Sequence, residues 1–146
     1  MIRRLVPGWL FSLAAILAAM AVAVYFRILL PYTIIFDGQW VKFSGVDSYF
    51  YMRLVDNLLA NFPQLMSFDP YFIYPGGSTI GNAPVFFVYI VAGTIRLLCG
   101  VEPSQQTADT IAAFIPAVMG CLLVIPVFFI GRALANRWAE IGRAHV

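Results

Sequence analysis

The chain has 146 residues, of which 62% are hydrophobic and 11% are charged, and its formal net charge is +2. Soluble globular domains are about 25% charged, so a chain this poor in charge could not cover a water-facing surface. The same composition excludes a disordered chain, which needs low hydrophobicity and high charge. The weak, scattered positive charge predicts no nucleic-acid partner. We therefore expect an integral membrane protein or a piece of one.

The first apolar run covers residues 5–26, and Arg3 and Arg4 precede it. It is long enough for a transmembrane helix, which needs about 20 residues. A cleaved signal peptide is the competing interpretation, but its apolar core is only about 7–15 residues long. We therefore expect a retained span, with the N-terminus placed in the cytoplasm by the two arginines.

A second span is expected at residues 111–130. Asp109 and Thr110 precede it, and either side chain could cap the helix. Its two internal prolines are tolerable in a membrane helix. Arg132 and Arg137 follow the run and mark a second cytoplasmic end.

Between the two spans, residues 84–95 form an apolar run of about a dozen residues, which is too short to cross a bilayer. Because arginines mark both outer ends as cytoplasmic, the number of crossings should be even. We therefore expect residues 29–109 to form one large external loop that contains an interfacial or re-entrant helix. The alternative is three crossings, with Arg132 outside.

A helix is predicted within this loop, opening at Asp47 and ending at Pro63. Its apolar side chains recur with a helical period on one face, which makes the helix amphipathic. These side chains are Phe50, Tyr51, Leu54, Val55, Leu58, Leu59 and Phe62. The opposite face is predicted to carry Ser48, Met52, Arg53, Asp56, Asn57 and Asn61. On that face Arg53 could pair locally with Asp56 or Asn57.

Four aspartates lie in the part of the loop that precedes its apolar run, namely Asp37, Asp47, Asp56 and Asp69. Asp47 and Asp56 are nine residues apart on one helix and so face opposite ways, which excludes a paired acid/base couple. Spacing alone favours Asp47 as a helix N-cap. The functional alternative is a ligand of Mg²⁺ or Mn²⁺, which prefer carboxylate oxygens. One carboxylate is not a metal site, so further ligands would have to come from outside this sequence.

Three other features complete the pattern. Residues 68–77 are rich in aromatic residues, proline and glycine and predict an ordered loop near the membrane interface, with a turn that starts at Asp69. Cys99 and Cys121 fit no metal or redox spacing and are expected to be buried apolar thiols.

The back-translation of residues 141–146 matches a common short-read sequencing adapter. We therefore expect that residues 140–146 are not native, that the natural protein is longer, and that His145 takes no part in catalysis.

The stretch GVDSYFYMR at residues 45–53 resembles the first outer-loop motif of the catalytic subunit of oligosaccharyltransferase, a Phe/Gly-x-Asp-Pro-Tyr/Trp-Tyr/Phe-x-x-Arg pattern. Residues 68–77, 114–120 and 124–132 also resemble that family, especially its archaeal and bacterial members. The resemblance covers nearly all of residues 5–139. The chain departs from the pattern at Ser48, where the family often has proline, which loosens the turn after Asp47.

The resemblance implies an all-α integral membrane protein of the cell membrane, in which residues 1–139 are the N-terminal part of a truncated GT-C-type membrane domain. It implies transfer of an oligosaccharide from a polyprenyl (pyro)phosphate carrier to the asparagine of Asn-x-Ser/Thr in an acceptor polypeptide. Asp47 would then be the catalytic aspartate that ligates Mn²⁺ or Mg²⁺ and contacts the acceptor amide. The family's later acidic pair and tryptophan-rich motif do not occur here, so we expect this chain alone to be inactive.

Two other functions stay open at this stage. Another glycosyltransferase of the GT-C class that uses polyprenyl-phosphate sugars, such as a protein mannosyltransferase, would also place a first-loop aspartate near the membrane. A small two-span membrane protein without enzymatic activity would use Asp47 only as a cap. The tyrosine and arginine register after Asp47 and the sequence at Tyr74 favour the oligosaccharyltransferase.

Overall fold

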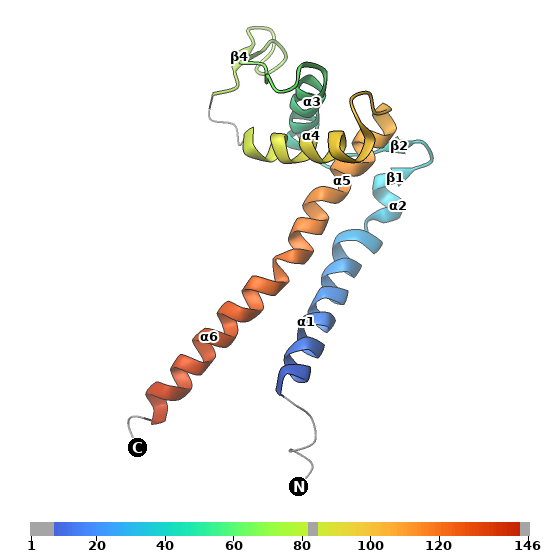
Figure 1. Cartoon of the computed structure of the whole chain (residues 1–146). Coiled ribbons are helices and arrows are strands. Elements are labelled where there is room, and N and C mark those ends of the chain that lie inside the picture. Colours follow the sequence, from blue (N-terminus) through green and yellow to red (C-terminus); the bar gives the residue numbers. More distant parts are fainter. Residues whose placement is uncertain (1–7, 82–84, 144–146) are drawn as a thin grey trace. The chain divides into compact units, whose positions relative to one another are not determined.

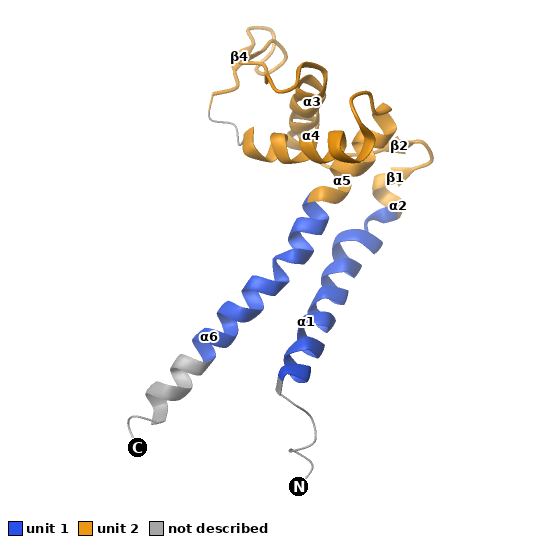
Figure 2. Ribbon diagram, in the orientation of Figure 1, with its two compact units in different colours: residues 1–32, 116–146 blue, residues 33–115 orange. Residues whose placement is uncertain are grey.

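The computed structural model describes residues 8–81 and 85–143 (Figure 1). The chain divides into two compact units (Figure 2). Unit 1 comprises residues 1–32 and 116–146, and unit 2 comprises residues 33–115. Arg3, Arg4, Pro84 and His145, which entered the sequence predictions, lie outside the described residues.

Unit 1 contains helix α1 (Gly8–Val24), the π-helical turn η1 (Tyr25–Leu29), the end of α5 (Gln105–Leu122) and α6 (Val124–Arg143). Two helical stretches, Trp9–Ile35 and Gln105–Ala135, are long and apolar enough to cross a membrane. Helix α1 packs against α6. Even so, no residue in the most hydrophobic part of Trp9–Ile35 is buried. The two predicted apolar helices are therefore confirmed by length and composition.

The second apolar stretch begins earlier than the sequence indicated. Helix α5 begins at Gln105, and the Oγ of Ser104 accepts the backbone N–H of Thr107 at 3.2 Å. The prediction that Asp109 or Thr110 caps this helix is therefore wrong, because a serine N-cap lies upstream of both. The helix is interrupted at Leu123, three residues before a proline that has no N–H to donate to the preceding turn.

Unit 2 is assembled from short helices and two β-hairpins. Helix α2 (Tyr32–Ile35) leads into it, and α3 (Val46–Asn61), α4 (Val85–Cys99) and the start of α5 are its main helices. Strand β1 (Phe36–Asp37) pairs antiparallel with β2 (Trp40–Val41), and β3 (Phe68–Asp69) pairs antiparallel with β4 (Ser78–Thr79).

The hairpins correct the prediction of an all-α fold, since the described chain is mostly helical with two short antiparallel ribbons. Only two residues separate β1 from β2, and Gly38, the first of them, has a φ of 60°. Tight two-residue hairpins need positive φ at this position, which glycine adopts without strain. The aspartate–glycine pair at 37–38 was therefore a turn signal.

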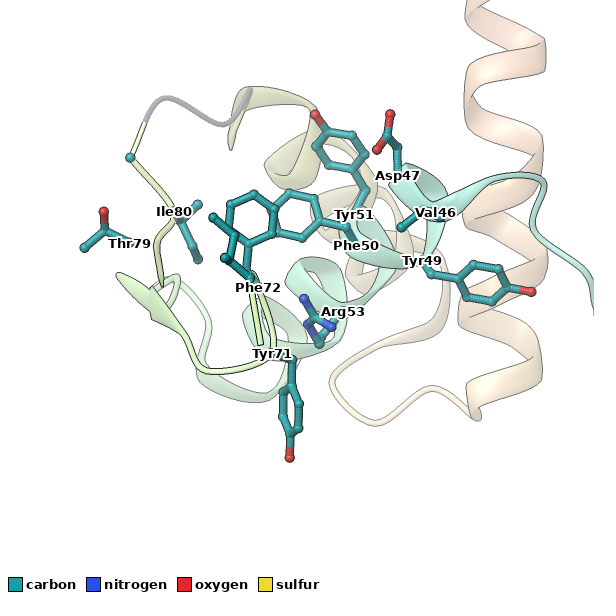
Figure 3. Close-up of a pocket in the computed structure, with 12 residues that line it drawn as sticks. Val46, Asp47, Tyr49, Phe50, Tyr51, Arg53, Tyr71, Phe72, Thr79 and Ile80 are labelled. Atoms are coloured by element: carbon teal, nitrogen blue, oxygen red, sulfur yellow. The ribbon is translucent and has the colours of Figure 1, made fainter. Parts of the chain in front are cut away.

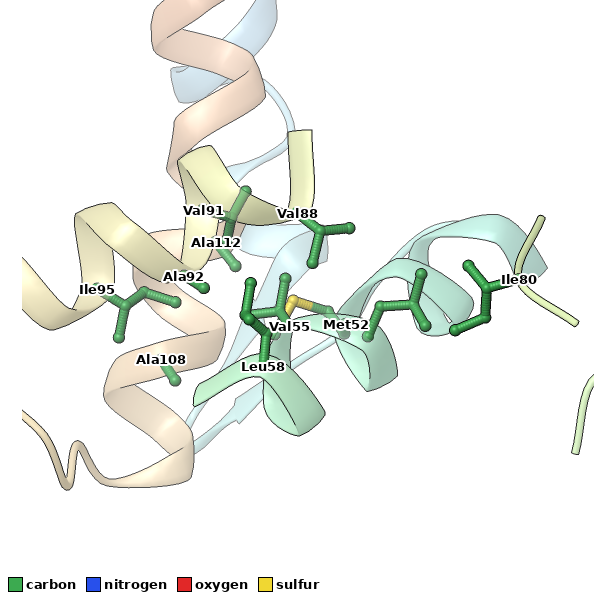
Figure 4. Close-up of a cluster of buried hydrophobic side chains, with 11 residues drawn as sticks. Met52, Val55, Leu58, Ile80, Val88, Val91, Ala92, Ile95, Ala108 and Ala112 are labelled. Carbon is green, nitrogen blue, oxygen red and sulfur yellow. The ribbon is translucent and has the colours of Figure 1, made fainter. Parts of the chain in front are cut away.

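The core of unit 2 lies between α3 and α4, with α5 beside them (Figure 4). Buried apolar side chains come from all three helices and from the residue that follows β4. They are Met52, Leu54, Val55, Leu58, Ile80, Val88, Val91, Ala92, Ile95, Ala108 and Ala112. The predicted helix in the loop is confirmed, since α3 ends at Asn61, and three residues of its predicted apolar stripe are fully enclosed.

Two burial predictions are wrong. Met52, placed on the polar face, is 8% exposed, because α3 is covered from more than one side and its buried surface is wider than one stripe. Cys99 is exposed at the end of α4, whereas Cys121 is buried as expected. Helix α4 has 15 residues and falls short of a bilayer's thickness. Its position relative to a membrane stays a prediction.

Candidate functional site

Asp47 lies in the first turn of α3 with its side chain exposed. The helix begins at Val46, and the N-cap position is taken by Gly45, which has a φ of 87° and forms no side-chain cap. The interpretation of Asp47 as an N-cap is therefore wrong, because Asp47 is already inside the helix. Within the described residues its carboxylate has no hydrogen bond or ion pair. A free carboxylate thus stands at the helix end where the dipole stabilises negative charge.

A hollow of about 760 Å³ lies beside Asp47, between α3 and the segment that contains β3 and β4 (Figure 3). We call it the Asp47 pocket. Its lining is mostly aromatic and apolar, with one carboxylate and one guanidinium. The lining residues are Val46, Asp47, Tyr49, Phe50, Tyr51, Arg53, Tyr71, Phe72, Ile73, Thr79, Ile80 and Gly81.

One ion pair joins helix α3 to strand β3 next to this pocket. The Nε of Arg53 donates to Oδ2 of Asp69 at 3.1 Å, and Nη2 of the same arginine donates to the same oxygen. Asp69 has no exposed surface, and its Oδ1 accepts the backbone N–H of Tyr71 at 2.9 Å. This last contact confirms the turn predicted to start at Asp69.

The expected local partners of Arg53 are used elsewhere, so the predicted pairing on α3 is wrong. Asn57 Oδ1 accepts the backbone N–H of Met66 at 3.0 Å. The carboxylate of Asp56 accepts from the side-chain amide of Gln105 at 3.3 Å. Arg53 instead turns to the loop 16 residues further along the chain.

Aromatic rings flank the same guanidinium. The Arg53 Cζ lies 5.8 Å from the centroid of the Phe50 ring and 5.7 Å from that of Tyr71, both within cation–π range. Phe50 also contacts the Phe72 ring at a centroid distance of 4.9 Å. Next to it, Ile73 holds a φ of 58° with 71% of its surface exposed. A β-branched residue is strained at that φ, and such strain clusters at functional sites.

The other two aspartates lie apart from this pocket. Asp56 lines a second hollow with Lys42 and Gln105, as expected for a residue nine positions from Asp47. Burial raises the pKa of Asp56, an effect that the Gln105 hydrogen bond opposes and the nearby Asp109 carboxylate reinforces. The hydrogen bond and charge of Lys42 lower the pKa of the exposed Asp37 carboxyl.

The described residues hold no complete ligand set for a hard metal ion. In the described parts of the chain no three His, Cys, Asp or Glu side chains lie together. Among the carboxylates whose side chains the structure describes, Asp47 alone combines exposure, a free carboxylate and a place on a pocket. Its oxygens are of the type that Mg²⁺ and Mn²⁺ accept, so the residue fits as one ligand among several.

The sequence analysis singled out Asp47 as a candidate and predicted the turn at Asp69, but it did not predict the aromatic side of the pocket. The Asp-Pro pair at 69–70 marked a turn, and nothing in it pointed to Arg53 as the partner. Ile73 carried no signal at all, because its backbone conformation depends on the path of the whole segment.

Comparisons with known proteins all find similarity to oligosaccharyltransferases. Residues 10–141 match the family model described as "Oligosaccharyl transferase STT3, N-terminal". A dolichyl-phosphooligosaccharide-protein glycotransferase of Archaeoglobus fulgidus is 34% identical over 131 residues, which is 90% of this chain and 15% of that relative. A dolichyl-monophosphooligosaccharide-protein glycotransferase of Haloferax volcanii is 37% identical over 98 residues, which is 66% of this chain and 9% of that relative.

A solved structure gives the same result. The crystal structure of the Archaeoglobus fulgidus oligosaccharyltransferase in its apo form matches with a TM-score of 0.69 and 33% identity. The match covers 80% of this chain and 13% of that structure's chain. The chain therefore spans only a small part of the length of the proteins that it resembles.

Proposed function

Because this chain belongs to the STT3 oligosaccharyl transferase family, whose N-terminal part it matches, we propose that it supplies part of the site for N-linked protein glycosylation. The proposed reaction moves an oligosaccharide from a polyprenyl (pyro)phosphate carrier to the asparagine of Asn-x-Ser/Thr in an acceptor polypeptide. The family match over residues 10–141 is the observation that carries this proposal. It favours the oligosaccharyltransferase over another lipid-sugar transferase or a non-enzymatic two-span protein.

Asp47 is the residue we propose for the chemistry. The amide nitrogen of asparagine is a poor nucleophile, because its lone pair is delocalised into the carbonyl. A carboxylate that accepts the amide N–H protons orients the nitrogen and favours its attack. Asp47 suits this role because its carboxylate is exposed and free, and its side chain lines a hollow of about 760 Å³.

A bound Mn²⁺ or Mg²⁺ is proposed as the cofactor, with Asp47 as one of its ligands. Such an ion would polarise the (pyro)phosphate leaving group and balance its developing charge. The remaining ligands are proposed to come from residues outside this chain. For the same reason we propose that the chain alone does not catalyse transfer.

We propose that unit 2 lies on the external side of the membrane, with the apolar stretches Trp9–Ile35 and Gln105–Ala135 as the spans on either side of it. The two stretches make an even number of crossings. Helix α4 then stays outside the bilayer core. This placement would bring Asp47 close to a lipid carrier held in the membrane.

The test is transfer of glycan from a lipid-linked oligosaccharide to an Asn-x-Ser/Thr peptide by the complete gene product. Asp47→Ala should abolish transfer while the protein still accumulates in the membrane. The matched control is Asp37→Ala, which removes an exposed carboxylate of the same unit outside the pocket and should keep normal turnover. Near-normal transfer by Asp47→Ala would refute the proposed role of this residue.

A further inference from the structure

Arg53 is the one cationic side chain among the residues that line the Asp47 pocket, all of which the structure describes. A guanidinium beside a proposed transfer site is an obvious candidate for binding a phosphate. Its contacts indicate a different role. Two of its nitrogens already donate to Asp69, and the rings of Phe50 and Tyr71 flank it.

Asp69 is the buried half of this pair and does not line the pocket. Its side chain has no exposed surface, whereas that of Arg53 is 38% exposed. One carboxylate oxygen takes the arginine, and the other takes the backbone N–H of Tyr71. Asp69 therefore links α3 to the start of the segment that turns back toward β4.

That segment lines the pocket with Tyr71, Phe72 and Ile73, which we define as the aromatic wall. Figure 3 labels the two aromatic residues, Tyr71 and Phe72. Phe72 contacts Phe50 on α3, three residues after Asp47 along the helix. Ile73 is held at a strained φ while largely exposed. A wall in this conformation needs an anchor, and the Arg53–Asp69 pair is the charged contact that supplies one.

We propose that Arg53 and Asp69 are a positioning pair, which holds the aromatic wall in place across from Asp47 and does not bind phosphate. The guanidinium charge is balanced within the protein, so the pocket presents ring faces and one free carboxylate. Such a surface suits a largely uncharged polypeptide segment better than a (pyro)phosphate. The pair is thus assigned to the acceptor side of the site, and this inference rests on the proposed transferase function.

The test compares Asp69→Asn, Arg53→Gln and the double variant in the complete gene product. Apparent KM values are measured separately for the acceptor peptide and for the lipid-linked oligosaccharide, together with kcat. Each single variant should raise the acceptor KM by about 10-fold to 100-fold, because a displaced wall misplaces the bound peptide. The kcat and the KM for the lipid-linked oligosaccharide should stay within about twofold, since the Asp47 end of α3 is unchanged.

The double variant separates positioning from direct binding. Each single change leaves one charge without its partner, whereas the double change removes both charges. The acceptor KM of the double variant should therefore be no higher than that of the worse single variant. Asp37→Asn, which breaks the exposed Lys42 pair in the same unit, should leave all three constants unchanged.

If the neutral variants fail to accumulate, Arg53→Lys provides the same test, because it keeps the charge and has a single donor group. It should raise the acceptor KM severalfold. An unchanged acceptor KM in Asp69→Asn or in Arg53→Lys would overturn the inference. So would a rise confined to the KM for the lipid-linked oligosaccharide in Arg53→Gln, which is the signature of a phosphate ligand. Absence of transfer by the unmodified protein would instead overturn the proposed function itself.

Discussion

The two units of this chain differ in how far their large apolar side chains are exposed. In unit 1 large side chains such as Leu17 and Phe26 remain about 60% exposed. In unit 2 the side chains of Leu54, Leu58 and Ile95 have no exposed surface. Both units are rich in apolar residues, so composition alone does not separate them.

This difference indicates the environment in which each unit is stable. A large exposed apolar surface is unstable in water but is the expected surface of a helix in lipid. A closed core is stabilised by burial within the chain itself, and it can hold polar side chains at fixed positions. Unit 2 is therefore the unit that can build a site, and it carries Asp47, Arg53 and Asp69.

The comparison predicts a large effect from one pair of matched substitutions. Leu58→Ala should lower the free energy of unfolding by about 3 kcal/mol, because it leaves a cavity in the core of unit 2. Leu17→Ala on α1 removes the same group from an exposed position and should change it by less than about 0.5 kcal/mol. Chemical denaturation of both variants in detergent micelles measures the difference. Equal losses would mean that unit 1 has a core of its own.

A second contrast lies between the two ion pairs of unit 2. Asp69→Ala should destabilise the fold by about 2–3 kcal/mol, because it leaves the charge of Arg53 without its partner in a partly enclosed place. Asp37→Ala breaks a pair whose two side chains are both mostly exposed, so the denaturation midpoint should move much less than in Asp69→Ala. A similar shift in both variants would contradict the assignment of Asp69 as the anchor of the loop.

The smallest expected effect concerns the pH dependence of folding stability, to which Asp56 and Asp37 contribute with opposite signs. The raised pKa of Asp56 means that the folded chain binds this proton more tightly than the unfolded chain, so its contribution to stability falls as the pH rises from the ordinary value toward the raised one. The lowered pKa of Asp37 means that its contribution is present above the ordinary value and is lost as the pH falls through the lowered one.

Melting temperatures between about pH 3 and pH 7 test this opposition. Asp56→Asn should reduce the decline on the rising side, because an amide still accepts the Gln105 hydrogen bond without a buried charge. Burial also raises the pKa of Asp109, which accounts for the part of the decline that stays. Asp37→Asn should remove the loss on the acidic side. A pH profile unchanged by either substitution would show that the two environments do not differ in the way described.

Part of this fold is readable from the sequence, and the reason is periodicity. The stripe through Leu54, Val55 and Leu58 is set by the helical repeat, so the buried face of α3 was predicted correctly. Met52 was not, because the width of a buried face depends on how many neighbours cover the helix. The start of α5 was also missed. The sequence prediction placed it where the hydrophobic run begins, at residue 111, whereas the helix begins at Gln105 with a polar first turn after the Ser104 cap.

The candidate site is readable only in part. Asp47 belongs to a short motif of consecutive residues, 45–53, and such a motif can be recognised in the sequence alone. The partnership of Arg53 with Asp69 joins residues 16 positions apart, and it depends on a turn whose direction no local pattern records. The free state of the Asp47 carboxylate likewise depends on Gly45 taking the N-cap position, which the sequence did not reveal.

The most direct measurement compares two isosteric substitutions on the same helix, Asp47→Asn and Asp56→Asn. Both remove one carboxylate charge from α3, and only Asp47 lines the aromatic pocket. In the complete gene product at saturating substrates, Asp47→Asn should lower the rate of glycan transfer by about 10²–10⁴-fold, while Asp56→Asn keeps the unmodified rate. Equal transfer rates for the two variants would contradict the account.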